Sequence, residues 1–203
     1  MRQMKRWIPA LFLLLVLAAC GGGTGGSPAE ELALAVRGEY LDMTACTAVL
    51  DVTADYGQRV YDYTIDVSYV KEGESVLTVT APEEIAGITA RINKESVVLE
   101  YDGVRWETGD LDGTGMSPVD AVPVVLEYAR EGFMAECGME ALEETPVLRV
   151  VCRDPEGTAG TGLECSLWFE PETHALLRAE LSQDGFVVIQ CVFTQFEMVL
   201  PES

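Results

Sequence analysis

The stretch Val60-Tyr61-Asp62-Tyr63-Thr64-Ile65-Asp66-Val67-Ser68-Tyr69 decides the fold class. Side chains point alternately to the two faces of a strand, so this stretch has one polar face and one apolar face. Such a pattern is typical of an antiparallel sheet with one side on the core. We expect a strand whose inner face carries Tyr61, Tyr63, Ile65, Val67 and Tyr69.

Much of the remaining chain shows the same alternation, broken by short turns rich in Gly, Pro, Asp and Glu. No alternation of single strands with single helices is present, so the strands should follow one another in an antiparallel meander. The expected strands span about 43–55, 75–81, 86–93, 96–102, 146–153, 163–170, 175–182 and 186–197.

Two segments carry helix signals. Ser27-Pro28-Ala29-Glu30 combines a serine N-cap, a proline at the first helical position and a glutamate three residues after the serine, which predicts a helix over residues 28 to about 42. Ser117-Pro118 repeats the design and predicts a helix over 118–131, with Val122 and Leu126 on its apolar face. Pro123 should loosen its first turns.

The last three expected strands are apolar on both faces. One face is expected to carry Trp168, Leu177, Leu181, Val188 and Val192, and the other Leu167, Phe169, Ile189 and Phe193. A sheet that is apolar on both sides needs cover on both sides, or a bound ligand or partner on one of them.

The first nineteen residues have the order of a secretory signal peptide: the basic residues Arg2, Lys5 and Arg6, an apolar run, and small residues before a cysteine. Leu17-Ala18-Ala19-Cys20 resembles the lipobox of bacterial lipoproteins. This resemblance implies lipidation of Cys20, cleavage before it, and anchoring at the extracytoplasmic face of the cell membrane. Residues 20–28 are predicted to be the lipidated cysteine followed by a flexible Gly/Ser tether.

The whole chain has thirteen basic and thirty-four acidic residues, a formal net charge of −21. Loss of the signal peptide would leave ten basic residues and a net charge of −24. Phosphate backbones and anionic lipid headgroups repel such a chain. This excludes nucleic-acid binding and leaves the acyl chains as the means of membrane attachment.

Five cysteines follow Cys20, with no paired spacing typical of zinc or redox motifs. Cys152 and Cys165 flank a turn at 155–162 nearly symmetrically, so a cross-strand disulfide between them is one alternative. The other is that the cysteines are small buried hydrophobic residues. Pairing is left open among Cys46, Cys137, Cys152, Cys165 and Cys191.

The order of these features resembles the LolA/LolB-like family of bacterial proteins: a lipobox, a capped helix, meandering strands, an internal Ser-Pro helix at 117–131 and final strands beginning Leu167-Trp168-Phe169-Glu170-Pro171. The resemblance implies an α+β fold over residues 29–203, an unclosed half β-barrel with a helical lid over a hydrophobic cavity. Carriers of this family hold lipoprotein acyl chains, and a germination lipoprotein among its relatives is a partner of a cortex-modifying enzyme. The anchor and glycine tether favour a Gram-positive cell surface over a diffusing carrier.

Two local motifs are rejected as sites. Asp110-Leu111-Asp112-Gly113-Thr114 matches the nucleophile loop of haloacid-dehalogenase-type phosphatases, but it follows a polar segment and no downstream lysine exists. As a calcium loop it has Ala121 where a bidentate glutamate is required. His174, the one histidine, lies in an expected turn, where its side chain should be solvated, and no nucleophile is assigned to it.

We therefore expect no catalytic residues, no metal and no cofactor. The leading hypothesis is a lipid-anchored protein that binds a lipid or other hydrophobic ligand in the half-barrel, lined by the five inward residues of 61–69 together with Val122 and Leu126. The alternative is a non-enzymatic partner or regulator of an exported cell-envelope enzyme.

Overall fold

The computed structural model describes residues 26–93, 96–109 and 113–201. The sequence predictions for residues 1–25, including Cys20, and for Asp110 and Asp112 lie outside these ranges. The elements in chain order are α1 (Pro28–Asp42), β1 (Ala45–Asp55), β2 (Val60–Val70), β3 (Ser75–Ala81), the 3-10 helix η1 (Glu83–Ile85), β4 (Thr89–Ile92), β5 (Val97–Tyr101), β6 (Val104–Gly109), α2 (Pro118–Glu131), β7 (Met134–Leu142), β8 (Thr145–Arg153), β9 (Leu163–Phe169), β10 (Leu176–Gln183) and β11 (Phe186–Val199).

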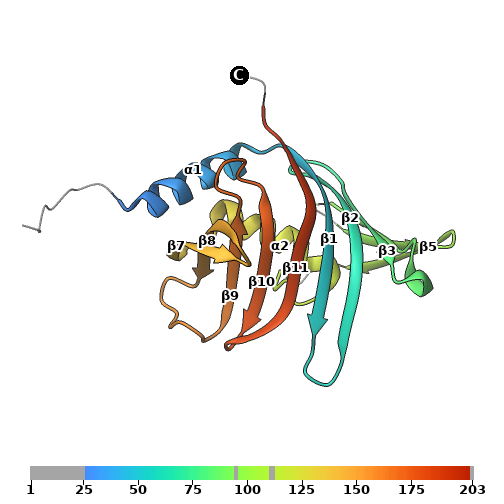
Figure 1. Cartoon of the computed structure of the whole chain (residues 1–203). Helices are drawn as coiled ribbons and strands as arrows, with labels where there is room; N and C mark the ends of the chain where they lie inside the picture. Colours follow the sequence, from blue (N-terminus) through green and yellow to red (C-terminus); the bar gives the residue numbers. More distant parts are fainter. Residues whose placement is uncertain (1–25, 94–95, 110–112, 202–203) are drawn as a thin grey trace, which may run out of the picture.

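The strands form one curved antiparallel sheet of eleven strands in the order β6-β5-β4-β3-β2-β1-β11-β10-β9-β8-β7. β1 pairs with β2 on one side and with the C-terminal β11 on the other, from Ala45 opposite Val199 to Ala54 opposite Ile189. β6 and β7 are the two edges and do not meet, so the barrel stays open (Figure 1). The expected half-barrel with a helical lid is confirmed.

The inner face of the sheet forms the core. On β1, inward residues alternate with exposed or half-buried ones, as the period of a strand requires. The five inward residues of β1 are at most 5 % exposed: Cys46, Ala48, Leu50, Val52 and Ala54. They pack in one cluster with inward residues of β2, β3 and β8–β11 and with both helices.

Helix α1 begins with the capping box that the sequence predicts. The Ser27 hydroxyl accepts from the Glu30 backbone N–H at 3.2 Å, and the Glu30 carboxylate accepts from the Ser27 N–H at 2.6 Å. Tyr40 fixes the other end, because its ring is fully buried between Phe169 and Phe196. Its hydroxyl donates to the carbonyl of His174 at 3.1 Å. Within the described part of the chain, neither helix is long and apolar enough to cross a membrane.

The structure contains two strands that the sequence did not predict, and they are the sheet edges β6 and β7. An edge strand packs against one neighbour and can stay exposed. β6 therefore has large apolar side chains on one face only, at Val104 and Trp106, and β7 has no clear alternation. His174 also differs from expectation: its side chain is 15 % exposed and Nδ1 lies 2.9 Å from the Glu39 carboxylate.

The face assignment of the last strands was partly wrong. Leu181 lies in the core opposite Ile189, and Val188 packs against the same cluster. Register shifts at 176/178 and 181/182 cause this, because each adds a residue and reverses which side chains point inward.

The outer face near Trp168 is covered by the protein itself. The guanidinium groups of Arg149 and Arg178 each lie 5.4 Å from the Trp168 ring centroid, one from each neighbouring strand. The indole N–H donates to Glu140. Cation–π contact of this kind leaves Trp168 only 7 % exposed. No ligand is needed to cover this side.

All five described cysteines are free thiols. Cys152 and Cys165 lie directly opposite each other on β8 and β9 and are both fully buried, as a cross-strand pair would be, but they are not bonded. Burial raises the pKa of Cys46 to about 12, that of Cys191 to about 12 and that of Cys152 to about 11. These thiols therefore stay neutral and act as small apolar side chains.

We predict that the protein loses stability as the pH rises from about 9 to about 12. The raised pKa values mean that the folded state keeps protons that the unfolded thiols lose above their ordinary value of 9.0. Each such thiol lowers the free energy of unfolding by roughly 1.4 kcal/mol per pH unit in this window. Urea unfolding at stepped pH measures the slope. Cys46→Ala should make it shallower, and Cys137→Ala, at the partly exposed cysteine, should leave it nearly unchanged.

Candidate ligand-binding face

One apolar row crosses the inner face of six neighbouring strands. Consecutive register pairs connect β1 to β2, β2 to β3, and so on to the edge strand β6. The row consists of Ala48, Val67, Leu77, Ala90, Leu99 and Trp106.

Exposure rises along this row towards the edge. The first four members are at most 5 % exposed, Leu99 is half-buried, and Trp106 is 49 % exposed. Tyr101 and Val104 form the next register pair on the same face and are 40 % and 50 % exposed. We call Leu99, Tyr101, Val104 and Trp106 the apolar wing. The four inner residues of the row belong to one buried cluster with side chains of both helices, whereas Tyr101, Val104 and Trp106 lie outside that cluster.

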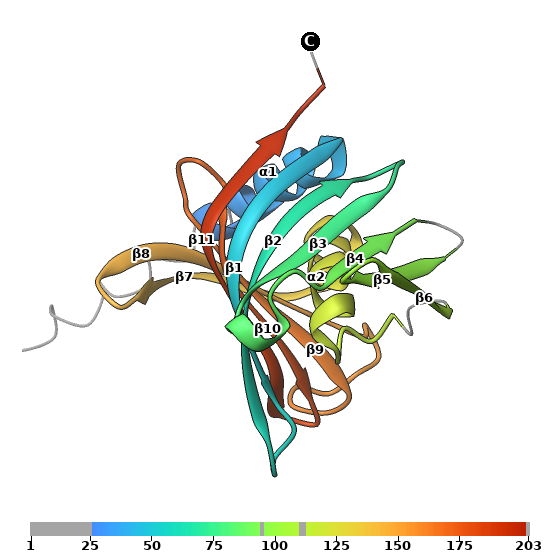
Figure 2. The same cartoon turned by 90° about the vertical axis from the view of Figure 1, so that its right-hand side faces the viewer.

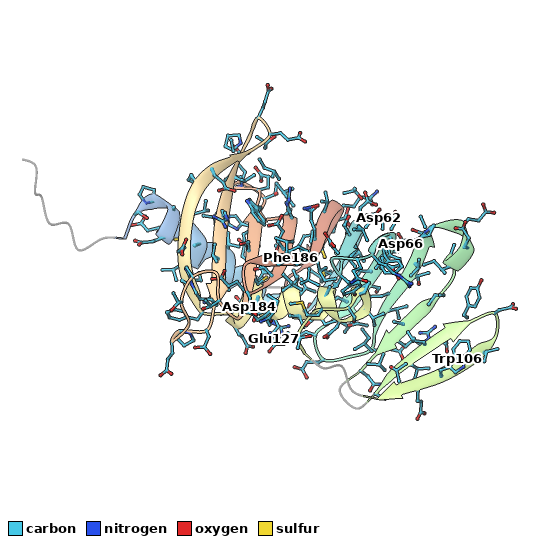
Figure 3. The ribbon with its side chains drawn as sticks, turned by 90° about the horizontal axis from the view of Figure 1, so that it is seen from below. Asp62, Asp66, Trp106, Glu127, Asp184 and Phe186 are labelled. Atoms are coloured by element: carbon cyan, nitrogen blue, oxygen red, sulfur yellow. The ribbon has the colours of Figure 1, made fainter. Side chains whose placement is uncertain are left out.

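The opposite face of the wing is polar. Arg91 binds Glu74 at 2.8 Å and Glu100 at 3.0 Å, and Arg105 binds Glu100 at 2.7 Å. This network fixes which side of β4–β6 faces solvent. The apolar side therefore points into the concavity, where Tyr101, Val104 and Trp106 are 40–50 % exposed. Figure 3 places Trp106 on the β5–β6 hairpin, away from α2.

Helix α2 lies in the rest of the concavity. It is seen behind β10 and β11 in Figure 1, and between the β7–β8 end and the β4–β6 end of the sheet in Figure 2. The helix begins after Ser117, which caps it: the Ser117 hydroxyl accepts from the Asp120 N–H at 3.2 Å. It continues through Pro123 without a break. Its inward side chains are nearly inaccessible, with Ala121 and Val125 fully buried. The space between α2 and the sheet is thus filled by side chains along this length.

Hydrogen bonds hold α2 at both ends. The Tyr56 hydroxyl donates to the Met116 carbonyl at 3.0 Å, just before the helix. At the other end, Arg130 donates to the Tyr69 hydroxyl and Arg37 of α1 donates to the Gly132 carbonyl. The proposed lid is therefore tied to β2, to the β1–β2 turn and to α1.

The residues predicted to line a cavity are spread over two environments. Ile65, Val67, Val122 and Leu126 are buried in the core. Tyr63 and Tyr69 are half-buried, and Tyr61 is 38 % exposed at the open end of β2. The sequence thus identified the inward stripe of β2, whose register against β1 places all five residues opposite its inward side chains.

Tyrosine rings form the rim near the start of β2. The rings of Tyr56 and Tyr61 lie 6.2 Å apart between centroids, and those of Tyr61 and Tyr63 lie 6.4 Å apart. Burial, with the neighbouring phenols, raises the pKa of Tyr63 and of Tyr56. These two phenols therefore stay neutral and offer hydroxyl groups beside apolar ring faces.

The apolar wing is the part of the site that sequence reasoning missed. Leu99 and Tyr101 belong to an expected strand. The next segment was not predicted as a strand, although its residues 104–108 alternate between Val, Trp and Thr on one face and Arg and Glu on the other. That alternation was the available signal for an edge strand with one apolar face.

Neither protein-family models nor curated protein sequences match this chain. Its fold is similar to that of several solved structures. An uncharacterized conserved protein from Thermus thermophilus is 13 % identical, with a TM-score of 0.50 and coverage of 86 % of this chain and 89 % of that one. A LolA superfamily protein from Nitrosomonas europaea is 12 % identical, with a TM-score of 0.40 and coverage of 85 % and 94 %. A chain in the complex of the CwlD amidase with the GerS lipoprotein from Clostridioides difficile is 13 % identical, with a TM-score of 0.42 and coverage of 86 % and 98 %.

At these identities the likeness concerns the fold alone. The open half-barrel of eleven strands with its two helices is the architecture that the sequence resemblance implied.

We predict that Gly115→Ala destabilises the protein by displacing the start of α2. Gly115 has φ +73, and an added Cβ would lie 2.5 Å from Leu181 Cδ1 and 3.1 Å from Val124 Cγ1. Strain and overpacking together should cost about 2–4 kcal/mol in urea unfolding. Gly113→Ala is the matched control, because Gly113 has φ +70 with open space around it and should cost only about 1 kcal/mol. If both variants lost the same free energy of unfolding, the close contact with Leu181 would not be what fixes the start of α2.

Proposed function

We propose that this chain is a non-enzymatic, lipid-anchored extracytoplasmic binding protein that holds an apolar ligand on the apolar wing. The observation that supports the proposal is the rise in exposure along the inner row, from a buried Ala48 to a half-exposed Trp106. An apolar face rimmed by polar residues is a typical binding surface.

The energy available at the wing fits a weak to moderate binding site. A Trp or Tyr side chain buries about 150–250 Å², so covering the exposed halves of Trp106 and Tyr101 contributes roughly 2 kcal/mol each. Val104 and Leu99 add to this. The ligand loses part of the gain through its own ordering, which leaves a surface suited to capture and release.

The charge of the protein limits which apolar ligands can bind. The chain carries a net charge of −21, and the wing itself contributes no charged side chain. An uncharged or cationic apolar molecule is therefore favoured over a free fatty-acid anion. The site uses apolar contact with the four side chains of the wing.

The proposed anchor would keep this binding at the membrane. Cys20 precedes the first described residue, Gly26, by six positions. Six extended residues span at most about 20 Å, so an acylated Cys20 would hold the domain close to the bilayer.

Mass spectrometry of the N-terminal peptide tests the modification: a diacylglyceryl mass on Cys20 is expected, and its absence would contradict anchoring.

A second candidate function is that of a partner of an exported envelope enzyme. The packing beneath α2 favours it, because Ala121, Val125 and Leu126 leave this part of the concavity without room for an acyl chain. In that case the apolar wing would bind a protein segment.

We predict that the mature protein binds the uncharged probe N-phenyl-1-naphthylamine and that Trp106→Ser weakens binding at least tenfold. The substitution removes the largest exposed apolar side chain of the wing. Phe186→Ser is the matched control, because Phe186 is 48 % exposed on the first residue of β11 and lies apart from the wing (Figure 3). Fluorescence titration measures both.

No probe binding by the unaltered protein, together with no lipid retained in native mass spectrometry, would overturn the apolar-ligand proposal. Equal weakening in the two variants would place the site elsewhere. Probe competition by a purified exported enzyme would favour the partner function.

A further inference from the structure

A second surface lies at the opposite edge of the sheet from the wing. An open groove of about 670 Å³ runs between the first turns of α1 and strand β7. Leu34, Met134 and Cys137 are the larger apolar side chains that line it, and Glu30, Glu31 and Glu136 are its acidic ones. Leu34 is 60 % exposed although it belongs to α1.

Strand β7 has a free edge beside this groove. It pairs with β8 on one side and is the last strand of the sheet in the part of the chain that the structure describes. An unpaired edge offers backbone N–H and C=O groups to an incoming strand. An added Cβ on Gly138, in the middle of β7, would meet no atom within 4 Å. One face of the strand is therefore open at this position.

The groove is acidic: among the described residues that line it, three are glutamates and none is basic. The Glu30 side chain accepts from the Ser27 N–H and Glu136 binds Arg153, and both residues also line the groove. Glu31 lies exposed on the first turn of α1. An occupant therefore needs positive charge near apolar side chains.

Two other occupants fit less well. A second copy of the chain pairing through β7 would bring Glu136 and Glu140 of both copies together, and like charges across a strand pair are destabilising. The segment 20–25, Cys-Gly-Gly-Gly-Thr-Gly, has neither basic nor large apolar side chains for the groove.

We propose that an extended segment of a partner protein, with alternating basic and apolar residues, adds a strand to β7 and places its apolar side chains in the α1–β7 groove. Backbone hydrogen bonds along β7 supply affinity, and the carboxylates at the groove select basic residues. This docking surface is separate from the apolar wing, since the two lie at opposite edges of the sheet.

The test uses a synthetic peptide with alternating Lys and Val residues, blocked at both ends, and its Glu/Val counterpart. We expect the mature protein to bind the Lys/Val peptide at least tenfold more tightly, measured by fluorescence anisotropy. Bound peptide should also slow alkylation of Cys137, because that thiol lines the groove while the other described cysteines are buried.

Two variants address the groove and one serves as control. Glu31→Lys and Leu34→Ser should each weaken peptide binding at least fivefold, since they alter charge and apolar contact in the groove. Glu127→Lys makes the same charge change on α2 outside the groove and should alter binding less than twofold. Backbone N-methylation of the peptide should abolish binding, because strand addition needs its N–H groups.

Equal weakening by Glu127→Lys and Glu31→Lys would reduce the effect to general charge attraction and overturn the proposal. Unchanged binding of the N-methylated peptide would exclude strand addition. The Glu31→Lys variant should still bind N-phenyl-1-naphthylamine. This measurement distinguishes loss of peptide binding at the groove from loss of ligand binding at the apolar wing.

Discussion

The pairing of β1 with both β2 and β11 is the constraint on which the rest of the structure depends. β1 is the one strand that joins the meander β2–β6 to the meander β7–β11. Its inward residues are buried from Cys46 to Ala54, so both halves share a single core. This central pairing joins the two meanders into one sheet, which curves around the helices and ends in two edges instead of closing into a barrel.

The two helices cover this sheet unequally. α1 and α2 contact each other, and they reach β7 to β10 more extensively than the β4–β6 end. Beneath α2 the inner face is packed with buried side chains, whereas Tyr101, Val104 and Trp106 on β5 and β6 stay 40–50 % exposed. The same sheet thus supplies a stable core at its centre and an exposed apolar surface at one edge.

The two edges differ chemically because their neighbours differ. At β5–β6 the ion pairs of Arg91, Arg105 and Glu100 lie on the outer face, which leaves an uncharged inner face for apolar contact. At β7 the first turn of α1 brings carboxylates beside a free strand edge. One surface therefore suits a neutral apolar ligand and the other a basic polypeptide, with neither surface needing a reactive side chain.

The sequence by itself determined what depends on local periodicity. The alternation in 61–69, the Ser-Pro caps at 27 and 117 and the turn residues predicted both helices, nine of the eleven strands and the inward stripe of β2. Only the tertiary structure decided which inward residues are covered, because Val67 and Trp106 share one row and differ only in what lies above them. It also decided the faces of Leu181 and Val188, since a bulge reverses alternation without a clear local signal. Burial and register depend on neighbours that are distant in sequence. The fold could therefore be predicted from the sequence, whereas the two proposed binding surfaces could not.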